Sequence, residues 1–204
     1  MILMYIKNLD GVWFGTACSE AKVFATAFAF DRRQLLRSLF KNIPFNVPFQ
    51  HLEDTTGFAE QVLVSLRDIY HGRNVAQRFH LATDHLPKYS RKVLETVALI
   101  PAGYVASYGS VAKAVGGSPR SVGRVMASNP FPLIIPCHRV IASNYSLGGY
   151  GGGVQVKLEI LSRERRNYSS ELEIPVNEKR LRVSPVEFLL FKYKNGLETF
   201  SKRK

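Results

Sequence analysis

The chain has 204 residues, of which 46% are hydrophobic and 22% are charged, so it can bury a core and is not a disordered polypeptide. Lysine and arginine number 28 against 16 aspartates and glutamates, which gives a net charge of +12. Such an excess favours a polyanionic partner, either nucleic acid or an acidic membrane surface, and it equally fits a charge that only aids solubility. No stretch approaches the roughly 20 apolar residues of a membrane span, and two cysteines cannot build a disulfide framework.

The two cysteines and the N-terminus bear on the cellular compartment. Neither Cys18 nor Cys137 lies in the paired spacing of a metal site, so we predict no metal and a reducing environment. The N-terminus lacks the basic, apolar and small-residue succession of a signal peptide. We therefore expect a soluble intracellular protein, cytoplasmic in a prokaryote and nuclear in a eukaryote, without membrane association.

The first residues are predicted to form a small antiparallel sheet. Apolar stretches at 4–7 and 12–18 flank Asp10-Gly11, a dipeptide that favours a tight hairpin turn. The stretch 22–30 alternates small and aromatic side chains, as a third strand does.

Helices are predicted after these strands. Asp31 is expected to cap the first, and Thr55 or Thr56 the second. Residues 42–50 carry two prolines and are expected to form a loop between them. Residues 73–84 are predicted to connect this domain to a second one, which begins with a helix near Pro87.

Two short helices are predicted beyond the connector, one over 110–115 and one from Ser118-Pro119, with glycines between them. Arg120 and Arg124 lie one turn apart on the second helix. This pattern fits a DNA-binding helix-turn-helix, and it also fits an ordinary helical hairpin.

The segment 129–140 joins an apolar run with three prolines to a cysteine beside a histidine, Cys137-His138. Proline restricts the backbone and favours an extended, non-helical segment. A thiol next to an imidazole can be a nucleophile, although a lone buried cysteine is commonly inert, which is how we interpret Cys18. Adjacent side chains of an extended segment face apart, so contact between Cys137 and His138 requires a turn or a bridging water. Glu164 is a candidate to orient the imidazole.

Two further stretches leave alternatives open. The glycine-rich run 148–153 lacks the lysine and Ser/Thr of a phosphate loop, so it either approaches a ligand closely or is a mobile surface loop. The basic segment 171–204 contains an apolar run at 186–191 and an Asn195-Gly196 turn, and it fits either a hairpin or a helix that begins at Ser184-Pro185.

The chemistry of a reactive thiol in a basic protein leaves two classes of function. One is a cysteine hydrolase. The other uses the thiol on a nucleic-acid base, which must first be flipped out of the duplex. The second class uses the helix-turn-helix, the arginines and the glycine-rich loop together.

Several motifs together resemble one known family. The segment 136–140 (PCHRV) matches the active-site signature of O6-alkylguanine-DNA alkyltransferases. The resemblance extends over residues 87–166 and includes 104–109 (YVASYG), 120–123 (RSVG), Asn129-Pro130 and 148–152 (GGYGG).

The resemblance implies an α/β (α+β) fold in two domains. Residues 1–84 would form a three-stranded antiparallel sheet with helices, similar to ribonuclease H. Residues 85–170 would form a helical domain with a helix-turn-helix, similar to a winged helix. Residues 171–204 lie beyond the usual end of the family.

The resemblance also implies a reaction and the residues that perform it. Cys137 would take the alkyl group from O6-alkylguanine, and from O4-alkylthymine, in a single turnover after the damaged base is flipped out. His138 would deprotonate Cys137 through a water, Glu164 would orient His138, and Tyr108 would donate toward the guanine. Asn129 would hold the turn before the cysteine segment. Val140, Tyr150 and Gly151 would line the substrate pocket, with Gly151 standing where many members have serine.

The implied partner is double-stranded DNA carrying O6-alkylguanine, bound through its minor groove by a monomer, and no cofactor is implied. Arg120 would enter the base stack. The other implied DNA contacts are Ser90, Tyr108, Gly109, Ser118, Gly123 and Ser143. A rival within the family is an alkyltransferase-like protein that binds the lesion without accepting the alkyl group, but such relatives lack the reactive cysteine.

Overall fold

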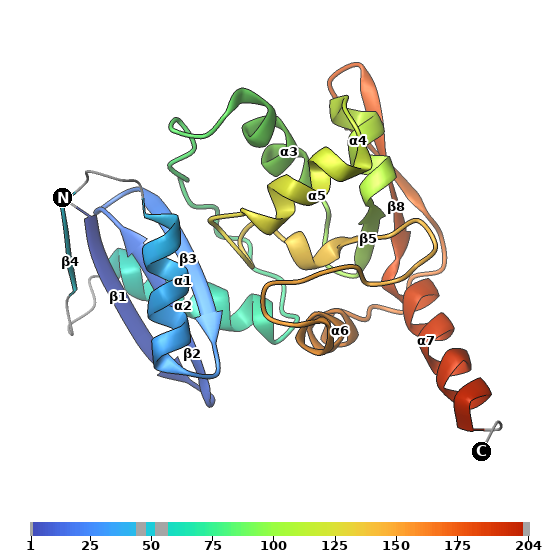
Figure 1. The fold of residues 1–204 in the computed structure, drawn as a ribbon, viewed down its shortest axis with the longest axis horizontal. Coiled ribbons are helices and arrows are strands. Elements are labelled where there is room, and N and C mark those ends of the chain that lie inside the picture. The colour runs from blue at the N-terminus through green and yellow to red at the C-terminus, as the bar shows by residue number, and fades with distance from the viewer. Residues whose placement is uncertain (1, 44–47, 52–56, 202–204) are drawn as a thin grey trace. The chain divides into compact units, whose positions relative to one another are not determined.

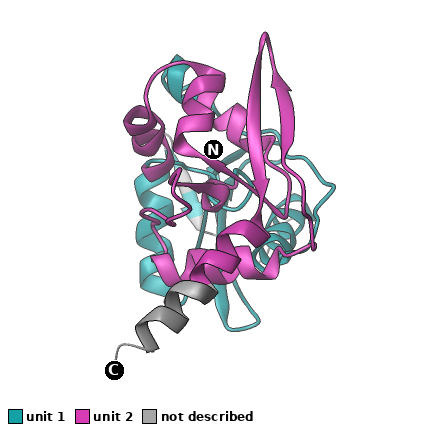
Figure 2. Cartoon of the chain, turned by 90° about the vertical axis from the view of Figure 1, so that its right-hand side faces the viewer, with its two compact units in different colours: residues 1–91, 128–135 teal, residues 92–127, 136–204 magenta. Residues whose placement is uncertain are grey.

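The computed structural model describes residues 2–43, 48–51 and 57–201, and these form two compact units, coloured separately in Figure 2. The first unit comprises residues 1–91 and 128–135, and the second comprises residues 92–127 and 136–204. The predicted helix caps Thr55 and Thr56 lie outside the described residues.

The first unit is built on a four-stranded sheet in the order β3-β2-β1-β4 (Figure 1). The strands are β1 (Ile2–Leu9), β2 (Val12–Cys18), β3 (Val23–Ala29) and β4 (Phe49–His51). The first three pair antiparallel, which confirms the prediction, and Asp10 and Gly11 make the turn with φ of 54° and 82°. The predicted loop over 42–50 is wrong at its end, where β4 pairs parallel with β1. Such a short strand depends on its partner and leaves little local signal.

Two helices cover opposite faces of this sheet. Asp31 caps α1 (Arg32–Asn42) by accepting a hydrogen bond from the amide of Gln34, as predicted. A Cβ added to Gly15 would lie 2.6 Å from Leu39 of α1, whereas the ring of the neighbouring Phe14 lies 5.8 Å from that of Tyr70 in α2 (Gly57–Tyr70). Adjacent residues of a strand face opposite sides, so the sheet is packed between α1 and α2.

Strand β3 also holds the segment that precedes the cysteine motif. The amide and the hydroxyl of Thr26 donate hydrogen bonds of 2.9 Å to the carbonyl oxygens of Pro130 and Pro132, respectively. Thr26 is fully buried, so both bonds are shielded from water. The residues 128–135 are therefore fastened to the sheet of the first unit, although they follow the helix-turn-helix in the sequence.

The second unit contains the predicted helix-turn-helix. Its first helix is α4 (Tyr108–Val115), which begins two residues before the predicted start because Ser107 caps it by accepting from the amide of Ser110. Gly116 and Gly117, with φ of 86° and 98°, end α4 and lead into α5 (Pro119–Ala127). The other elements of this unit are β5 (Tyr104–Ser107), a 3-10 turn η1 (Cys137–Arg139), β6 (Val140–Ile141) and α6 (Val154–Arg163). Helix α3 (Lys88–Ala98) belongs to this unit from Lys92 onward.

The C-terminal segment contains both structures that the sequence left open. A hairpin of β7 (Leu172–Val176) and β8 (Lys179–Pro185) is followed directly by α7 (Val186–Ser201). Strand β8 pairs antiparallel with β5, so the second sheet has the order β6-β5-β8-β7. The turn predicted at Asn195-Gly196 is wrong, because both residues lie within α7. The helix that begins with the apolar run 186–191 continues through Asn195 and Gly196.

Candidate active site around Cys137

Cys137 lies at the start of a single turn of 3-10 helix. The amide of Arg139 donates to the carbonyl of Pro136 at 2.8 Å, and the amide of Val140 donates to the carbonyl of Cys137. The predicted extended geometry is therefore wrong at residues 137–139, although the preceding prolines do exclude a longer helix. Cys137 is only 8% exposed, and His138 is fully buried.

The buried neighbour of His138 is Glu164, the residue that ends α6. One carboxylate oxygen lies 3.0 Å from Nε2 of His138, and Glu164 is 1% exposed. Arg139 donates to the same carboxylate from Nε at 3.0 Å and from Nη2 at 2.7 Å, and from Nη1 to the carbonyl of Ile100 at 2.6 Å. Both partners of Glu164 thus belong to the 3-10 turn, and the carboxylate fixes the orientation of the imidazole and of the guanidinium.

The protonation states follow from these contacts. Burial would raise the pKa of Glu164, but His138 and Arg139 lower it to about 2, so the carboxylate is ionised. Burial lowers the pKa of His138, against the opposing effect of Glu164, so the imidazole is neutral near pH 7. An ionised carboxylate can only accept, which places the imidazole proton on Nε2 and leaves the lone pair on Nδ1.

Nδ1 of His138 is the free basic atom of this arrangement. It is buried and has no hydrogen-bond partner among the residues that the structure describes. A buried polar atom without a partner is costly, so it marks a position where a further group is expected to bind. His138 therefore has the tautomer and the open nitrogen that a general base for the adjacent thiol requires.

Lys157 is a second buried charge near the cysteine, and sequence analysis missed it. Its Nζ donates hydrogen bonds of 2.6 Å to the carbonyl oxygens of Val140 and Leu147 and lies 5.9 Å from the ring centroid of Tyr150. Burial lowers the pKa of Lys157 to about 8, and the negative charge of the Cys137 thiolate opposes this shift. A cation so placed favours the thiolate over the thiol.

The spacing along α6 carries a signal that could have identified Lys157. Lys157, Ile160, Leu161 and Glu164 recur at helical intervals and share one buried face. A lysine and a glutamate on an apolar helical face are rarely buried unless each has a partner.

Tyr108, the first residue of α4, lies where three elements meet. A Cβ on Gly148 of the glycine-rich loop would be 3.3 Å from the Tyr108 hydroxyl, and a Cβ on Gly123 of α5 would be 4.0 Å from its ring. Gly148 also has a φ of 67°, so this close approach depends on glycine. Burial and the charge of Cys137 raise the pKa of Tyr108, which keeps its hydroxyl protonated and able to donate.

The remaining predicted site residues fall in different surroundings. Asn129, in the first unit, closes the loop before the motif by donating to the carbonyl of Ile135 at 3.1 Å and accepting from the amide of Phe131 at 3.0 Å. Val140 is buried, and its carbonyl already accepts one hydrogen bond from Lys157. Gly151 is exposed with no atom within 4 Å of an added Cβ, so the serine that many members of the resembled family carry would fit there.

The predicted DNA contacts are mostly accessible. Arg120 and Ser118 are exposed at the start of α5, and the Ser118 hydroxyl caps that helix by accepting from the amide of Ser121. Ser143 is exposed on the loop before the glycine-rich run, and Gly109 lies on the first turn of α4. Ser90 belongs to the first unit, unlike the others.

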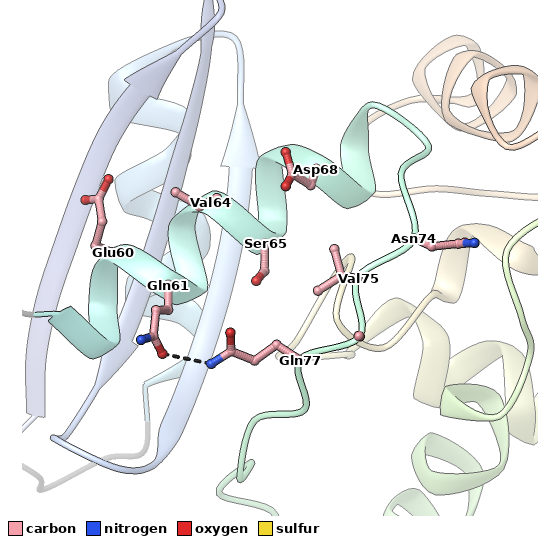
Figure 3. Close-up of a pocket in the computed structure, with 9 residues that line it drawn as sticks. Glu60, Gln61, Val64, Ser65, Asp68, Asn74, Val75 and Gln77 are labelled. Atoms are coloured by element: carbon pink, nitrogen blue, oxygen red, sulfur yellow. Dashed lines mark hydrogen bonds between the residues drawn. The ribbon is translucent and has the colours of Figure 1, made fainter.

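Other features of the described residues do not contribute to this site. Cys18 is buried on β2, and burial raises its pKa to about 11, so its thiol stays protonated. A groove of about 350 Å³ in the first unit lies between α2 and residues 74–77 and contains none of the predicted site residues (Figure 3). Within the described ranges no group of three metal-ligating side chains occurs, and no helix is long and apolar enough to cross a membrane.

The C-terminal hairpin is less basic than its position in a basic tail suggested. Residues 171–184 contain three acidic and three basic side chains. Arg182 pairs with Glu171, and Arg180 lies 3.6 Å from Glu173. These pairs leave the hairpin without a net charge.

Comparison with known proteins gives consistent matches. Residues 88–166 match the family model described as 6-O-methylguanine DNA methyltransferase, DNA binding domain. A methylated-DNA–protein-cysteine methyltransferase of Thermococcus kodakarensis is 31% identical over 162 residues, which cover 75% of this chain and 88% of that protein. One of Methanothermobacter thermautotrophicus is 51% identical over 77 residues, covering 38% of this chain and 44% of that protein.

The chain thus spans about half the length of several curated relatives that it matches at about 50% identity. Among solved structures, the O6-methylguanine-DNA methyltransferase of Pyrococcus kodakaraensis aligns with a TM-score of 0.59 and 28% identity. The alignment covers 80% of this chain and 99% of that one.

Proposed function

Because this chain belongs to the O6-methylguanine DNA methyltransferase family, we propose that it repairs DNA by moving the alkyl group of O6-alkylguanine onto Cys137. The observation that carries this proposal is the buried, neutral His138 beside Cys137, with Nε2 held by Glu164 and Nδ1 open. The same site would accept O4-alkylthymine, whose alkylated oxygen is chemically similar.

The proposed reaction begins with formation of the thiolate. The Cys137 proton passes through one water to Nδ1 of His138, and the ionised Glu164 stabilises the resulting imidazolium. The buried ammonium of Lys157 stabilises the thiolate. No cofactor is required for this step.

The thiolate then displaces guanine from the alkyl carbon. A sulfur–carbon bond forms, the carbon–O6 bond breaks, and the electron pair of that bond moves onto the guanine. Tyr108 donates a hydrogen bond toward the guanine as its negative charge develops, which its raised pKa allows. Overall the thiol proton ends on the guanine, so no other reactant is consumed.

The thioether product is stable, so each protein molecule should react once. With methylated duplex in excess over protein, we expect loss of O6-methylguanine to stop at one equivalent, measured by chromatography of the digested DNA. Cys18→Ala should reach the same end point, because Cys18 is buried and protonated. Continued turnover past one equivalent would contradict the sacrificial role of Cys137.

We propose that the partner is duplex DNA, bound by a monomer through the minor groove, in the cytoplasm of a prokaryote or the nucleus of a eukaryote. Arg120 would occupy the space that the flipped base leaves, since it is exposed at the first turn of α5. The exposed or half-exposed Ser90, Gly109, Ser118, Gly123 and Ser143 would contact the DNA around it.

Arg120→Ala should separate base flipping from chemistry. Flipping costs a few kcal/mol of lost stacking, so without Arg120 we expect transfer from duplex DNA to slow by roughly 10- to 100-fold. Reaction with the free alkylated base needs no flipping and should change by less than about twofold. The measurement is the single-turnover rate on each substrate.

The matched control is Arg124→Ala, which removes the same charge from the same helix one turn later. It should weaken DNA affinity through charge alone and leave the ratio of the two rates unchanged. Equal slowing of both substrates in Arg120→Ala would remove the flipping role from Arg120.

A further inference from the structure

The C-terminal segment 172–201 lies beyond the residues that match the family, yet it is folded onto the second unit. Strand β8 pairs with β5, the strand that leads directly into Tyr108. Helix α7 follows β8 without a loop and extends away from the sheet (Figure 1). The first turns of α7 are therefore fixed to the strand that positions the active-site tyrosine.

Helix α7 packs against the start of the glycine-rich loop. Val186 and Leu189 are fully buried and share an apolar cluster with Leu147, together with Val105, Ile141 and Leu161. Tyr193 is partly buried against the same cluster. Leu147 is 2% exposed and immediately precedes Gly148, so α7 covers the point where the glycine-rich loop leaves the core.

Two polar contacts join α7 to the same loop. The amide of Leu147 donates to the hydroxyl oxygen of Tyr193 at 3.3 Å. The ammonium of Lys192 donates to the carbonyl of Asn144, three residues earlier. These contacts come from consecutive residues of α7 and fasten both ends of the turn 144–147.

Leu147 connects α7 to the site. Its carbonyl accepts a hydrogen bond of 2.6 Å from the buried Lys157, and the next residue, Gly148, is held against Tyr108. A displacement of Leu147 would therefore alter the surroundings of Lys157 and of Tyr108.

We propose that α7 positions the glycine-rich loop for alkyl transfer and that Tyr193 is its positioning residue. The catalytic consequence rests on the proposed function, whereas the structural link does not. Tyr193 acts through Leu147, whose amide donates to its hydroxyl oxygen.

The test compares Tyr193→Phe with Tyr145→Phe in the full chain. Tyr193→Phe keeps the packed ring and removes the oxygen that accepts from Leu147. Tyr145 packs against the same apolar cluster, so Tyr145→Phe removes a hydroxyl from the same region without touching that contact.

Amide hydrogen exchange of the peptide 144–153, followed by mass spectrometry without DNA, gives the first readout. Loss of one hydrogen bond should speed exchange at Leu147 by about three- to tenfold in Tyr193→Phe and leave it unchanged in Tyr145→Phe. Unchanged exchange in Tyr193→Phe, or equal acceleration in both variants, would overturn the link between α7 and the loop. This readout holds even if the wild-type protein transfers no alkyl group.

The second readout is the transfer step itself. At saturating methylated duplex, the rate for Tyr193→Phe should fall about three- to tenfold while DNA affinity stays within about twofold. A positioning role predicts slower transfer with unchanged DNA affinity. General loosening of the second unit would weaken DNA binding as well. A normal rate together with faster exchange would overturn the catalytic part of the proposal. Absence of transfer in the wild type would instead refute the proposed function.

Discussion

Replacing Cys137 with alanine should abolish alkyl transfer, by more than about 10⁴-fold, while leaving the fold and the binding of methylated DNA intact. Among the described residues the other thiol is Cys18, which is buried with its pKa raised to about 11 and cannot substitute for the nucleophile. His138 and Lys157 would remain in place, but neither supplies the thiolate that the proposed displacement requires.

The variant is informative because alanine differs from cysteine by one sulfur atom. Cys137 is buried, with 8% exposure, and the substitution removes only one sulfur atom, so the cost in unfolding free energy should be about 1 kcal/mol. Transfer is measured as O6-methylguanine lost from duplex DNA, and binding as retardation of the same duplex. Cys18→Ala is the control and should transfer normally. Repair by the Cys137→Ala protein would place the acceptor elsewhere.

Replacing Glu164 with glutamine should slow transfer by about 100-fold. Glutamine keeps one oxygen for the proton on Nε2 of His138 but removes the charge that stabilises the imidazolium. It also leaves the guanidinium of Arg139 half-buried without its carboxylate, and breaking such a pair costs about 3 kcal/mol of unfolding free energy. The single-turnover rate and urea unfolding check the two effects.

Glu159→Gln is the matched control for Glu164→Gln. Glu159 lies on the same helix, and its carboxylate lies 3.7 Å from the guanidinium of Arg163 in a partly exposed pair. The transfer rate should therefore change by less than about twofold, and the unfolding free energy by less than about 0.5 kcal/mol. Equal effects of the two substitutions would mean that Glu164 contributes charge to α6 and nothing specific to His138.

Acid should destabilise the protein through Glu164 and its buried partner His138. The folded pKa of Glu164, about 2, lies below its ordinary value of 4.5, so its stabilisation is complete above pH 4.5 and is lost as the pH falls toward 2. The lowered pKa of His138 acts in the same direction, because below pH 6.5 the unfolded chain binds a proton that the folded chain resists. Between pH 5 and pH 3, Glu164→Gln should therefore lose less stability than the wild type.

The parts of the fold that local patterns specify were predicted well. Asp10-Gly11 between alternating strands predicts the hairpin of β1 and β2, and Asp31 predicts the start of α1. Strand β4 was missed because three residues pairing parallel to β1 depend on a distant partner. The C-terminal segment was ambiguous because its apolar run suits a strand or a helix, and packing against the second unit decides for the helix.

The candidate active site was likewise predicted only in part. A cysteine and a histidine adjacent in the sequence are evident, and Glu164 was a candidate partner for His138, from which it lies 3.0 Å away. The 3-10 turn that presents Cys137 was missed because the surrounding prolines favour extended geometry. Lys157 and Arg139 were missed because their roles depend on burial, which residue type alone predicts to be absent for charged side chains.

The central claim is that Cys137 accepts the alkyl group, and the most direct measurement is the mass of its peptide. The protein is mixed with duplex DNA carrying one O6-methylguanine, digested and weighed. We predict one added methyl group on the peptide that contains Cys137, none on the peptide that contains Cys18, and none anywhere in Cys137→Ala. Binding of the duplex with no added mass on any peptide, or a methyl group on another residue, would contradict transfer to Cys137.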